Sequence, residues 1–328
     1  MDTTDPDIRF TEGVCNYCQD LTVKRRELKI QQLDRPWVYN KLRSGGCIIG
    51  LSGGVDSSLC LHYLIENGIY PKATFSVDNG WNTKEADENI MKLVEGLKVP
   101  FYRYVLRQPN FRNLQQAFLC SGTKNVEIPT DHVLMACSYQ MAVEQGVKYI
   151  VGGGNIATEG VMPRAWGYQA RDLRFIKAIH KKFMGERLAG VPTISLTKYL
   201  YYRFWKKIEV INLLDYYDYN RNKAKNMLAD IYGWKDYGEK HCESKFTMWF
   251  QNRYLPIKFG IDKRLPHYSS LINSGQMTRD EALKLLKEPL LYPELGFSLN
   301  YKKHSYKDFP NSEWIWNLLS KIKKWSVE

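Results

Sequence analysis

The sequence predicts an α/β protein with a doubly wound, mostly parallel sheet, a mainly helical C-terminal region and a short N-terminal cysteine knuckle. Three observations predict this class. Short apolar runs alternate with segments of helical periodicity over the first half of the chain. A loop rich in glycine and serine follows the first of these runs. From about residue 200 the sequence becomes aromatic and basic, and strand-like alternation ends.

Strands and helices alternate along the first half of the chain. The predicted strands are residues 46–51, 73–77, 101–106 and 148–151, and the predicted helices are residues 59–68, about 83–97 and about 131–145. Parallel strands joined by such helices place ligands at the carboxyl ends of the strands. A last amphipathic helix is predicted at residues 312–325, where Trp314, Leu318, Leu319 and Ile322 lie at helical spacing, and we expect it to dock on the protein body.

Composition restricts the cellular setting. The chain has 328 residues, a net charge of +12 and a mean hydropathy of −0.44, and no apolar run reaches the roughly 20 residues of a membrane-spanning helix. Its first residues are acidic and polar, unlike a signal peptide, and its seven cysteines are scattered, which favours a reducing compartment. We therefore expect a cytoplasmic protein. The positive charge predicts an anionic partner but does not choose between nucleic acid, nucleotide-sugar phosphates and a membrane surface.

Residues 52–58, hereafter the SGGVDSS loop, join the first predicted strand to the helix that follows. Gly53 and Gly54 let the main chain approach an anion closely, and the N–H groups at the helix start point toward it. Asp56 would repel a phosphate, so we expect it to bind Mg²⁺. A simple Gly-Gly turn with a helix cap is the alternative. The residues expected to bind ATP or pyrophosphate are Leu51, Ser52, Gly53, Gly54, Val55, Asp56, Ser57, Ser58, Val77 and Asp78.

This loop differs from a Walker loop, for which the sequence has no match. It resembles the loop of the PP-loop ATP pyrophosphatases, a superfamily that includes asparagine, GMP and NAD synthetases and several tRNA-modifying enzymes. The resemblance implies an adenine nucleotide alpha hydrolase-like fold and cleavage of ATP between the α and β phosphates. It also implies that adenine and ribose lie near Val77 and Asp78, whose alternative role is an ordinary strand end and turn.

Six further strings narrow the choice: residues 77–82, 128–132, 153–159, 237–247, 258–264 and 274–283. They closely resemble the N-acetyl sugar amidotransferases of the WbpG and PseA type, over about residues 2–293. The resemblance implies that an acetamido group of a nucleotide-linked N-acetyl sugar becomes an acetamidino group through an O-adenylyl imidate. Such sugars belong to bacterial surface polysaccharides such as the O-antigen of lipopolysaccharide.

The implied organisation has three parts: an N-terminal cysteine-containing segment (1–40), a PP-loop ATP pyrophosphatase domain (41–200) and a mainly helical substrate or partner region (201–328). The chain offers no recognisable Cys-His-Glu glutaminase constellation. Ammonia is therefore expected from a separate partner, which in this family resembles the glutaminase and cyclase subunits of imidazole-glycerol-phosphate synthase.

The implied reaction needs Mg²⁺, cations for developing phosphate charge and a base near the incoming nitrogen. The candidate catalytic residues are Asp56, His132, Glu159, His241, Lys263 and Arg264, with Asp56 and Glu159 as magnesium ligands. The candidate substrate-binding residues are Asp131, Asn155, Lys240 and Glu243. Each histidine has a structural role as its alternative. For the charged residues of the C-terminal region, the alternative is a solvated ion-pair face.

Cys15 and Cys18 form a Cys-x-x-Cys pair, which is half of a tetrahedral zinc site. Members of the family carry another such pair just upstream. Three alternatives remain open: a second pair upstream of Met1, a ligand borrowed from elsewhere in the chain, or two buried thiols without zinc.

Two other functions compete with the amidotransferase. A tRNA-thiolating enzyme would explain the positive charge, but such enzymes usually have Lys where Val55 stands, and Cys120 and Cys137 are not closely spaced. A non-catalytic nucleotide-binding protein is the second rival, although an intact Asp56 with Ser57 and Ser58 argues for turnover. Nucleic acid is therefore not the partner that we expect.

Overall fold

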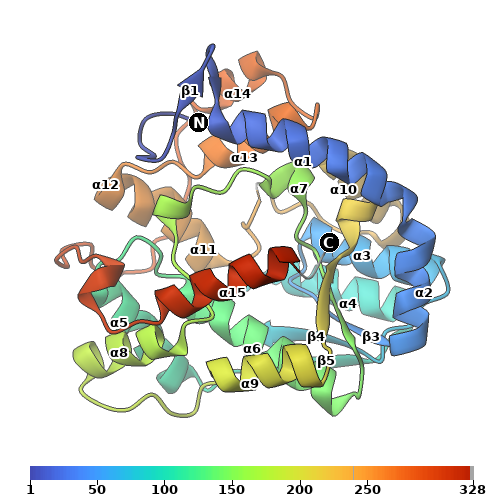
Figure 1. Ribbon diagram of the computed structural model, residues 1–328, viewed down its shortest axis with the longest axis horizontal. Helices are drawn as coiled ribbons and strands as arrows, with labels where there is room; N and C mark the ends of the chain where they lie inside the picture. Colours follow the sequence, from blue (N-terminus) through green and yellow to red (C-terminus); the bar gives the residue numbers. More distant parts are fainter. Residues whose placement is uncertain (239, 326–328) are drawn as a thin grey trace.

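A parallel sheet forms the centre of the molecule in the computed structural model, which describes residues 1–238 and 240–325 (Figure 1). Within these residues its strands are β3 (Cys47–Gly50), β4 (Ala73–Asp78), β5 (Phe101–Val105), β6 (Tyr149–Gly152) and β7 (Glu209–Asn212). They lie in the order β5-β4-β3-β6-β7, and every neighbouring pair is parallel. The strand order reverses between β3 and β6, so the carboxyl ends of these two strands flank the topological switch point.

All four predicted strands are confirmed, but the sheet has a fifth strand that the sequence did not predict. Strand β7 lies beyond residue 200, inside the region expected to be mainly helical, and it pairs with β6 at the edge of the sheet. Only Ile211 of its four residues is buried. Strand β7 is short, and only two of its four residues, Val210 and Ile211, are apolar, so it gives no long apolar run.

Helices cover both faces of the sheet, as a doubly wound fold requires. Ile49 packs with α2 (Arg35–Gly45), α3 (Val55–Glu66), α4 (Lys84–Leu97) and α10 (Arg221–Tyr232) on one face. Ile48 packs with α6 (Ile128–Glu144) on the other face. Adjacent residues of one strand thus enter different cores, because successive side chains point to opposite faces.

The aromatic residues of the C-terminal region build a third core outside the sheet. Trp249 and Tyr254 pack there with Phe118 of α5 (Gln108–Ser121) and Phe175 of α8 (Leu173–Met184). The C-terminal elements are α11 (Lys245–Trp249), η4 (Phe250–Tyr254), α12 (Leu255–Phe259), α13 (Arg264–Asn273), α14 (Arg279–Leu285), η5 (Tyr306–Asp308) and α15 (Glu313–Trp325). The mainly helical character predicted for this region is confirmed.

Helix α15 crosses the front of the molecule in Figure 1 and docks through a residue other than those predicted. Trp316 is buried and lies 5.5 Å from the ring of Tyr199, whereas Trp314 and Leu318 are exposed. The predicted helix is confirmed, but Trp314 and Leu318 do not lie on its docked face. Trp316 packs on the protein body instead, and Leu319 of the predicted face is half-buried.

The remaining elements connect these layers. They are β1 (Phe10–Thr11), β2 (Val14–Cys15), α1 (Asn16–Leu33), α7 (Ile156–Glu159), η1 (Arg164–Trp166), α9 (Leu196–Leu200), η2 (Tyr201–Trp205) and η3 (Leu213–Tyr216). The hairpin β1–β2 leads into α1, which runs along the edge of the molecule beside α13 (Figure 1). None of the described helices is long and apolar enough to cross a membrane. Two parts of the regions predicted above lie outside the described residues. They are Glu239, which belongs to the 237–247 string, and residues 326–328 of the predicted C-terminal region.

Candidate active site

The SGGVDSS loop lies at the topological switch point, between β3 and α3, as the sequence predicted. Gly53 has a left-handed φ of +80°, and a Cβ atom there would lie 2.2 Å from the carbonyl oxygen of Ala86 in α4. Trp234 Nε1 donates a hydrogen bond to the Gly53 carbonyl oxygen at 3.2 Å. Only glycine fits between these two neighbours, so the residue type at position 53 fixes how closely the loop packs on α4.

Hydroxyl groups hold the loop in a compact form. Ser52 Oγ accepts a hydrogen bond from Gly54 N at 3.2 Å, and Ser57 Oγ accepts one from Ser52 N at 3.3 Å. Gly153, directly after β6, lies so close that a Cβ atom on it would be 3.0 Å from Ser57 N. Glycine at position 153 thus lets the chain that follows β6 pack closely against the first turn of α3.

A segment of the C-terminal region, residues 234–238 and 240–245, covers the loop and is called the strap below. Its Tyr237 hydroxyl accepts a hydrogen bond from Val55 N at 3.3 Å. The strap then runs beside the residues that follow β4: Thr83 N donates to the Glu243 carbonyl oxygen at 2.9 Å, and Lys245 N donates to the Trp81 carbonyl oxygen at 2.8 Å. These main-chain bonds place the Glu243 side chain over the loop, where a Cβ atom on Gly54 would be 3.4 Å from Glu243 Oε1.

Lys240 of the strap joins the two carboxylates that were predicted to bind magnesium. Its Nζ lies 3.1 Å from Asp56 Oδ2 and 3.0 Å from Glu159 Oε1, and it donates to Thr158 Oγ1 at 2.7 Å. The Tyr219 hydroxyl donates to the other oxygen of Asp56. Asp56 and Glu159 thus converge on one cationic position beside the loop.

This pair of carboxylates fits Mg²⁺ by donor chemistry, because Mg²⁺ binds through one or two carboxylates and takes further oxygens from water and phosphates. In the described part of the chain, no group of three or more Cys, His, Asp or Glu side chains forms a complete metal cage. A magnesium ion here would therefore depend on the phosphates of a bound nucleotide.

A second charged group lies where α6, α11 and α13 meet. Thr247 Oγ1 donates to Glu127 Oε1 at 2.5 Å, and burial together with the nearby Asp131 raises the pKa of Glu127 to about 8. The surrounding protein also raises the pKa of Asp131 to about 6. Burial lowers the pKa of Lys263, while the charges of Glu127, Glu159 and Asp131 act in the opposite direction. These three carboxylates therefore all favour the charged form of Lys263.

Two histidines adjoin both charged groups. His241 has a left-handed φ of +68°, and its Nε2 lies 3.6 Å from Glu159 Oε1. Burial, with the cations Lys240 and Lys263, lowers the pKa of His241 to about 3, so the ring is neutral. The His267 ring lies 5.5 Å from it, and His267 Nδ1 is 3.4 Å from the Thr158 carbonyl oxygen, which identifies Nδ1 as the protonated nitrogen. Its Nε2 is then a free acceptor.

Several buried polar atoms at this place have no hydrogen-bond partner within the described residues. They are His267 Nε2, Glu243 Oε2 and Arg221 Nε. A pocket beside them is lined by Thr158, Arg221, Lys240, Cys242, Met248, Gln251, Asn252, Lys263, Arg264, His267, Tyr268 and Leu271. Buried polar groups are normally paired, so such a cluster indicates a site that a polar ligand completes.

Comparison with known proteins bears on the C-terminal region of the chain. Residues 243–323 match the family model described as "LPS biosynthesis protein WbpG-like, C-terminal domain". We call residues 243–323 the WbpG-like domain below, after this similarity. The resemblance to the WbpG type is thereby confirmed for this region. No curated protein sequence matches the chain.

Solved structures with some likeness to the chain include the following three. NMN synthetase from Francisella tularensis is 14% identical, covers 89% of this chain and 100% of its own, and has a TM-score of 0.34. NH3-dependent NAD synthetase from Campylobacter jejuni is 16% identical, with coverages of 62% and 93% and a TM-score of 0.31. The U34-tRNA thiolase NcsA from Methanococcus maripaludis is 13% identical, with coverages of 81% and 84% and a TM-score of 0.34.

The WbpG-like domain supplies Glu243, Thr247, Lys263 and His267 to the site, and Asp56 and Glu159 come from the α/β part. The structure thus brings together six predicted residues: Asp56, Glu159, Lys240, His241, Glu243 and Lys263. Asp131 acts on this site electrostatically, because its charge raises the pKa of both Glu127 and Lys263. Val77 and Asp78 end β4 beside the loop, where the Asp78 side chain accepts a hydrogen bond from Gly80 N at 2.8 Å.

Three predicted residues have structural partners instead. His132 is buried, its Nδ1 donates to the Ala170 carbonyl oxygen at 2.7 Å, and its Nε2 accepts from Ile194 N at 3.2 Å. The Asn155 side chain caps α7 by accepting from Thr158 N at 2.9 Å. Arg264 lines the pocket, yet its guanidinium pairs with Asp262 at 2.8 Å and donates to carbonyl oxygens at the end of α14. Both ring nitrogens of His132 are engaged by the main chain, so we exclude it from the site.

Cys15 and Cys18 lie together at the start of α1, with their sulfur atoms 3.4 Å apart. Asn273 Nδ2 is 3.4 Å from Cys18 Sγ, and burial raises the pKa of the Cys18 thiol. No third zinc ligand joins them among the described residues. Two thiols and an amide do not fit a tetrahedral zinc site, so a ligand borrowed from the described part of the chain is not supported.

Sequence reasoning missed Glu127, Tyr219, Tyr237, Thr247 and His267 as site residues. Glu127 directly precedes the 128–132 string, and Tyr237 and Thr247 lie inside the 237–247 string, so position next to those strings was the available signal. Nothing local distinguishes Tyr219 from the other tyrosines around it.

Proposed function

We propose that this chain is an ATP-dependent amidotransferase that converts an acetamido group of a nucleotide-linked N-acetyl sugar to an acetamidino group. The product would enter a bacterial surface polysaccharide such as the O-antigen of lipopolysaccharide. One observation carries the proposal: the WbpG-like domain directs Glu243 and Lys263 to the same site as the SGGVDSS loop and Asp56. In this proposal the loop would hold the nucleotide, and the adjoining pocket, which Lys263 and His267 line, would bind the sugar.

The first step would activate the amide oxygen. The loop and the first turn of α3 would hold the pyrophosphate part of ATP, and Asp56 and Glu159 would hold Mg²⁺, which neutralises phosphate charge when bound. The acetamido oxygen attacks the α phosphorus, and the bond between that phosphorus and the oxygen bridging to the β phosphate breaks. Lys240 and Lys263 would stabilise the negative charge that develops on the α phosphate.

The second step would replace oxygen by nitrogen. Ammonia attacks the carbon of the O-adenylyl imidate, the bond between that carbon and the AMP oxygen breaks, and AMP leaves. The incoming nitrogen must lose a proton. Glu127 is our choice of acceptor. With a pKa of about 8 only its ionised minor fraction accepts a proton at neutral pH, and that carboxylate is a stronger base than usual.

A separate glutaminase would supply the ammonia. The sequence has no recognisable Cys-His-Glu glutaminase constellation. The resemblance to the amidotransferase family implies that the ammonia comes from partner subunits like those of imidazole-glycerol-phosphate synthase. Purified alone, the chain should therefore use a high concentration of ammonium but not glutamine. Glutamine-dependent product from the purified chain would contradict this part of the proposal.

The proposal is tested with ATP, ammonium and candidate UDP-diacetamido sugars, followed by mass spectrometry of the sugar. We expect an oxygen of one acetamido group to be replaced by NH, and AMP and pyrophosphate to accumulate in equal amounts. Asp56→Asn keeps the side-chain size but removes the charge, so circular dichroism should be unchanged while pyrophosphate release falls about a hundredfold or more. Pyrophosphate release by this variant at the wild-type rate would refute the role of the loop.

A further inference from the structure

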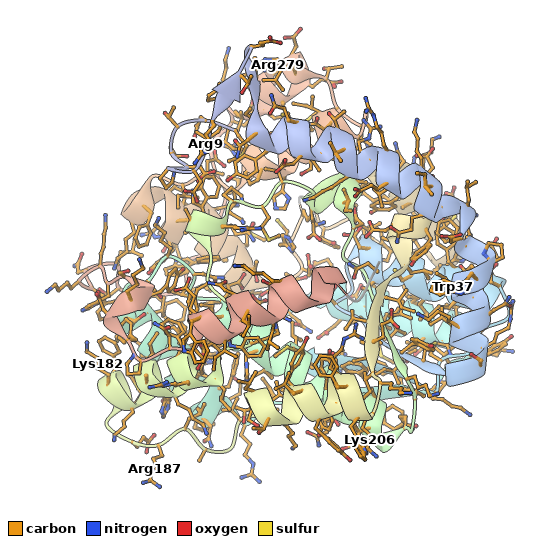
Figure 2. All side chains as sticks on the ribbon, in the orientation of Figure 1. Arg9, Trp37, Lys182, Arg187, Lys206 and Arg279 are labelled. Atoms are coloured by element: carbon orange, nitrogen blue, oxygen red, sulfur yellow. The ribbon has the colours of Figure 1, made fainter. Side chains whose placement is uncertain are left out.

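Most of the net positive charge of the chain is concentrated between Leu173 and Ile208. This segment has nine Lys and Arg residues and one acidic residue, Glu186, so it holds eight of the twelve net positive charges. The nine are Arg174, Lys177, Lys181, Lys182, Arg187, Lys198, Arg203, Lys206 and Lys207, and all except Arg203 are exposed. Figure 2 shows Lys182, Arg187 and Lys206 pointing outward along one side of the molecule.

Three aromatic side chains lie exposed within this segment. Tyr201, Phe204 and Trp205 of η2 are 46%, 62% and 78% exposed. Their neighbour Tyr202 is buried and its ring lies 6.1 Å from that of Tyr139, so the helix is fixed by one face while its aromatic face is free. Large apolar side chains gathered on a surface indicate an interaction site, because their exposure to water is unfavourable.

Lysines flank these aromatic side chains on both sides along the chain. Lys198 lies one turn before Tyr201, and Lys206 follows Trp205, with its Nζ 5.9 Å from the Tyr201 ring centre. We call Lys198, Tyr201, Phe204, Trp205 and Lys206 the basic aromatic face. Aromatic rings beside long cationic side chains are typical of surfaces that lie at a lipid headgroup layer.

The basic aromatic face lies near the amino ends of the sheet strands, whereas the SGGVDSS loop lies at their carboxyl ends. Helix η2 ends at Trp205, just before the amino end of β7 begins at Glu209. The loop follows the carboxyl end of β3, and β3, β6 and β7 are parallel. A partner bound at the basic aromatic face would therefore leave the active site open to a dissolved nucleotide sugar.

We propose that the basic aromatic face docks the protein on an anionic phospholipid membrane. The charge is complementary to acidic headgroups, and Phe204 and Trp205 are the side chains that would enter the interfacial layer. Single-stranded nucleic acid is bound in a basic groove that follows its backbone, whereas here the rings project from a helix. The family description names lipopolysaccharide biosynthesis, and lipopolysaccharide is itself a membrane lipid, which favours a membrane as the partner.

The test is co-sedimentation of the full chain with vesicles of phosphatidylglycerol and phosphatidylcholine, compared with vesicles of phosphatidylcholine alone. We expect binding to the anionic vesicles only, weakened by salt. Lys198→Glu with Lys206→Glu, and separately Phe204→Ser with Trp205→Ser, should each reduce binding about tenfold or more. Lys24→Glu with Lys29→Glu, two exposed lysines of α1, is the charge control, and Trp37→Ser, an exposed tryptophan of α2, is the aromatic control.

Thermal unfolding followed by circular dichroism shows whether each variant is folded, and pyrophosphate release should be unchanged in all of them. The proposal is overturned if the wild-type chain does not sediment with anionic vesicles, or if the control variants lose binding equally. Binding of single-stranded RNA through these residues, without vesicle binding, would assign the face to nucleic acid. A dimer in light scattering that only Phe204→Ser with Trp205→Ser abolishes, again without vesicle binding, would assign it to a second copy of the chain.

Discussion

Lys263 and Arg264 are adjacent in the sequence, yet their side chains serve different purposes. Helix α13 begins between them, with Lys263 as its N-cap and Arg264 as its first residue. The charges of Glu127, Glu159 and Asp131 act on Lys263, whereas Arg264 pairs with Asp262 and with carbonyl oxygens at the end of α14. From the sequence alone the two cations look equivalent. Their side chains differ in surroundings because α13 begins between them.

Lys263→Ala and Arg264→Ala should therefore fail in different assays. For Lys263→Ala we expect kcat and kcat/KM to fall about a hundredfold, the loss typical of removing one preorganised charge. For Arg264→Ala we expect about 2 kcal/mol less stability toward urea, with activity per folded molecule within about threefold of wild type. A large activity loss in a fully stable Arg264→Ala would show that Arg264 acts on the substrate and that its contacts with α14 are secondary.

Glu127 links the chemistry of the site to the stability of the protein. Its pKa is raised from 4.5 to about 8, mainly by burial and next by Asp131, so folding favours the protonated carboxyl. The unfolded chain releases this proton near pH 4.5, and the folded chain holds it until about pH 8. Wild-type stability contributed by this group is thus complete below pH 4.5 and is lost as the pH rises to about 8.

Glu127→Gln removes this dependence, since its amide does not ionise. The variant should be more stable than wild type at pH 8, by about 4 kcal/mol, and about equal to it at pH 4.5. Urea unfolding across this pH range measures the difference, with the exposed Glu27→Gln of α1 as the control for loss of one carboxylate. A stability difference that is the same at every pH would contradict the assigned shift. Turnover should fall, because the proposed proton acceptor is gone.

At the level of elements, the site depends on how closely the SGGVDSS loop packs on α4 and under the strap. The strand, loop and helix were predictable, because an apolar run, two glycines and helical periodicity follow one another within residues 46–68. The strap was not predictable. Its position comes from main-chain bonds between residues 81–83 and 243–245, which are far apart in sequence and leave no local pattern.

The variant Gly53→Ala tests this packing, and Gly68→Ala is its control. Both glycines have a left-handed φ, +80° at Gly53 and +68° at Gly68, but only Gly53 has a neighbour, the Ala86 carbonyl oxygen, within 4 Å of an added Cβ atom. Gly68→Ala should lose about 1 kcal/mol of stability from backbone strain alone. Gly53→Ala should lose about 3 kcal/mol, with pyrophosphate release abolished. Equal losses measured by urea unfolding would mean that the loop can move away from α4 without cost.

For the molecule as a whole, two regions of the chain build one site. The sequence predicted the division near residue 200, but β7 at residues 209–212 belongs to the sheet, so the α/β part takes its edge strand from beyond that point. It also predicted most of the charged residues that converge on the loop. It could not predict that Glu127 and His267 complete them, because burial and long-range contacts, rather than residue type, give these two side chains their properties.

The most direct measurement follows the oxygen atom of the substrate acetamido group. If that oxygen attacks the α phosphorus, a nucleotide sugar labelled with oxygen-18 in its acetamido groups must transfer one labelled oxygen to AMP. With ATP and ammonium present, mass spectrometry should find AMP carrying one oxygen-18, unlabelled pyrophosphate and an acetamidino sugar lacking that oxygen. Unlabelled AMP, or release of ADP and phosphate in place of AMP and pyrophosphate, would contradict adenylation of the sugar at this site.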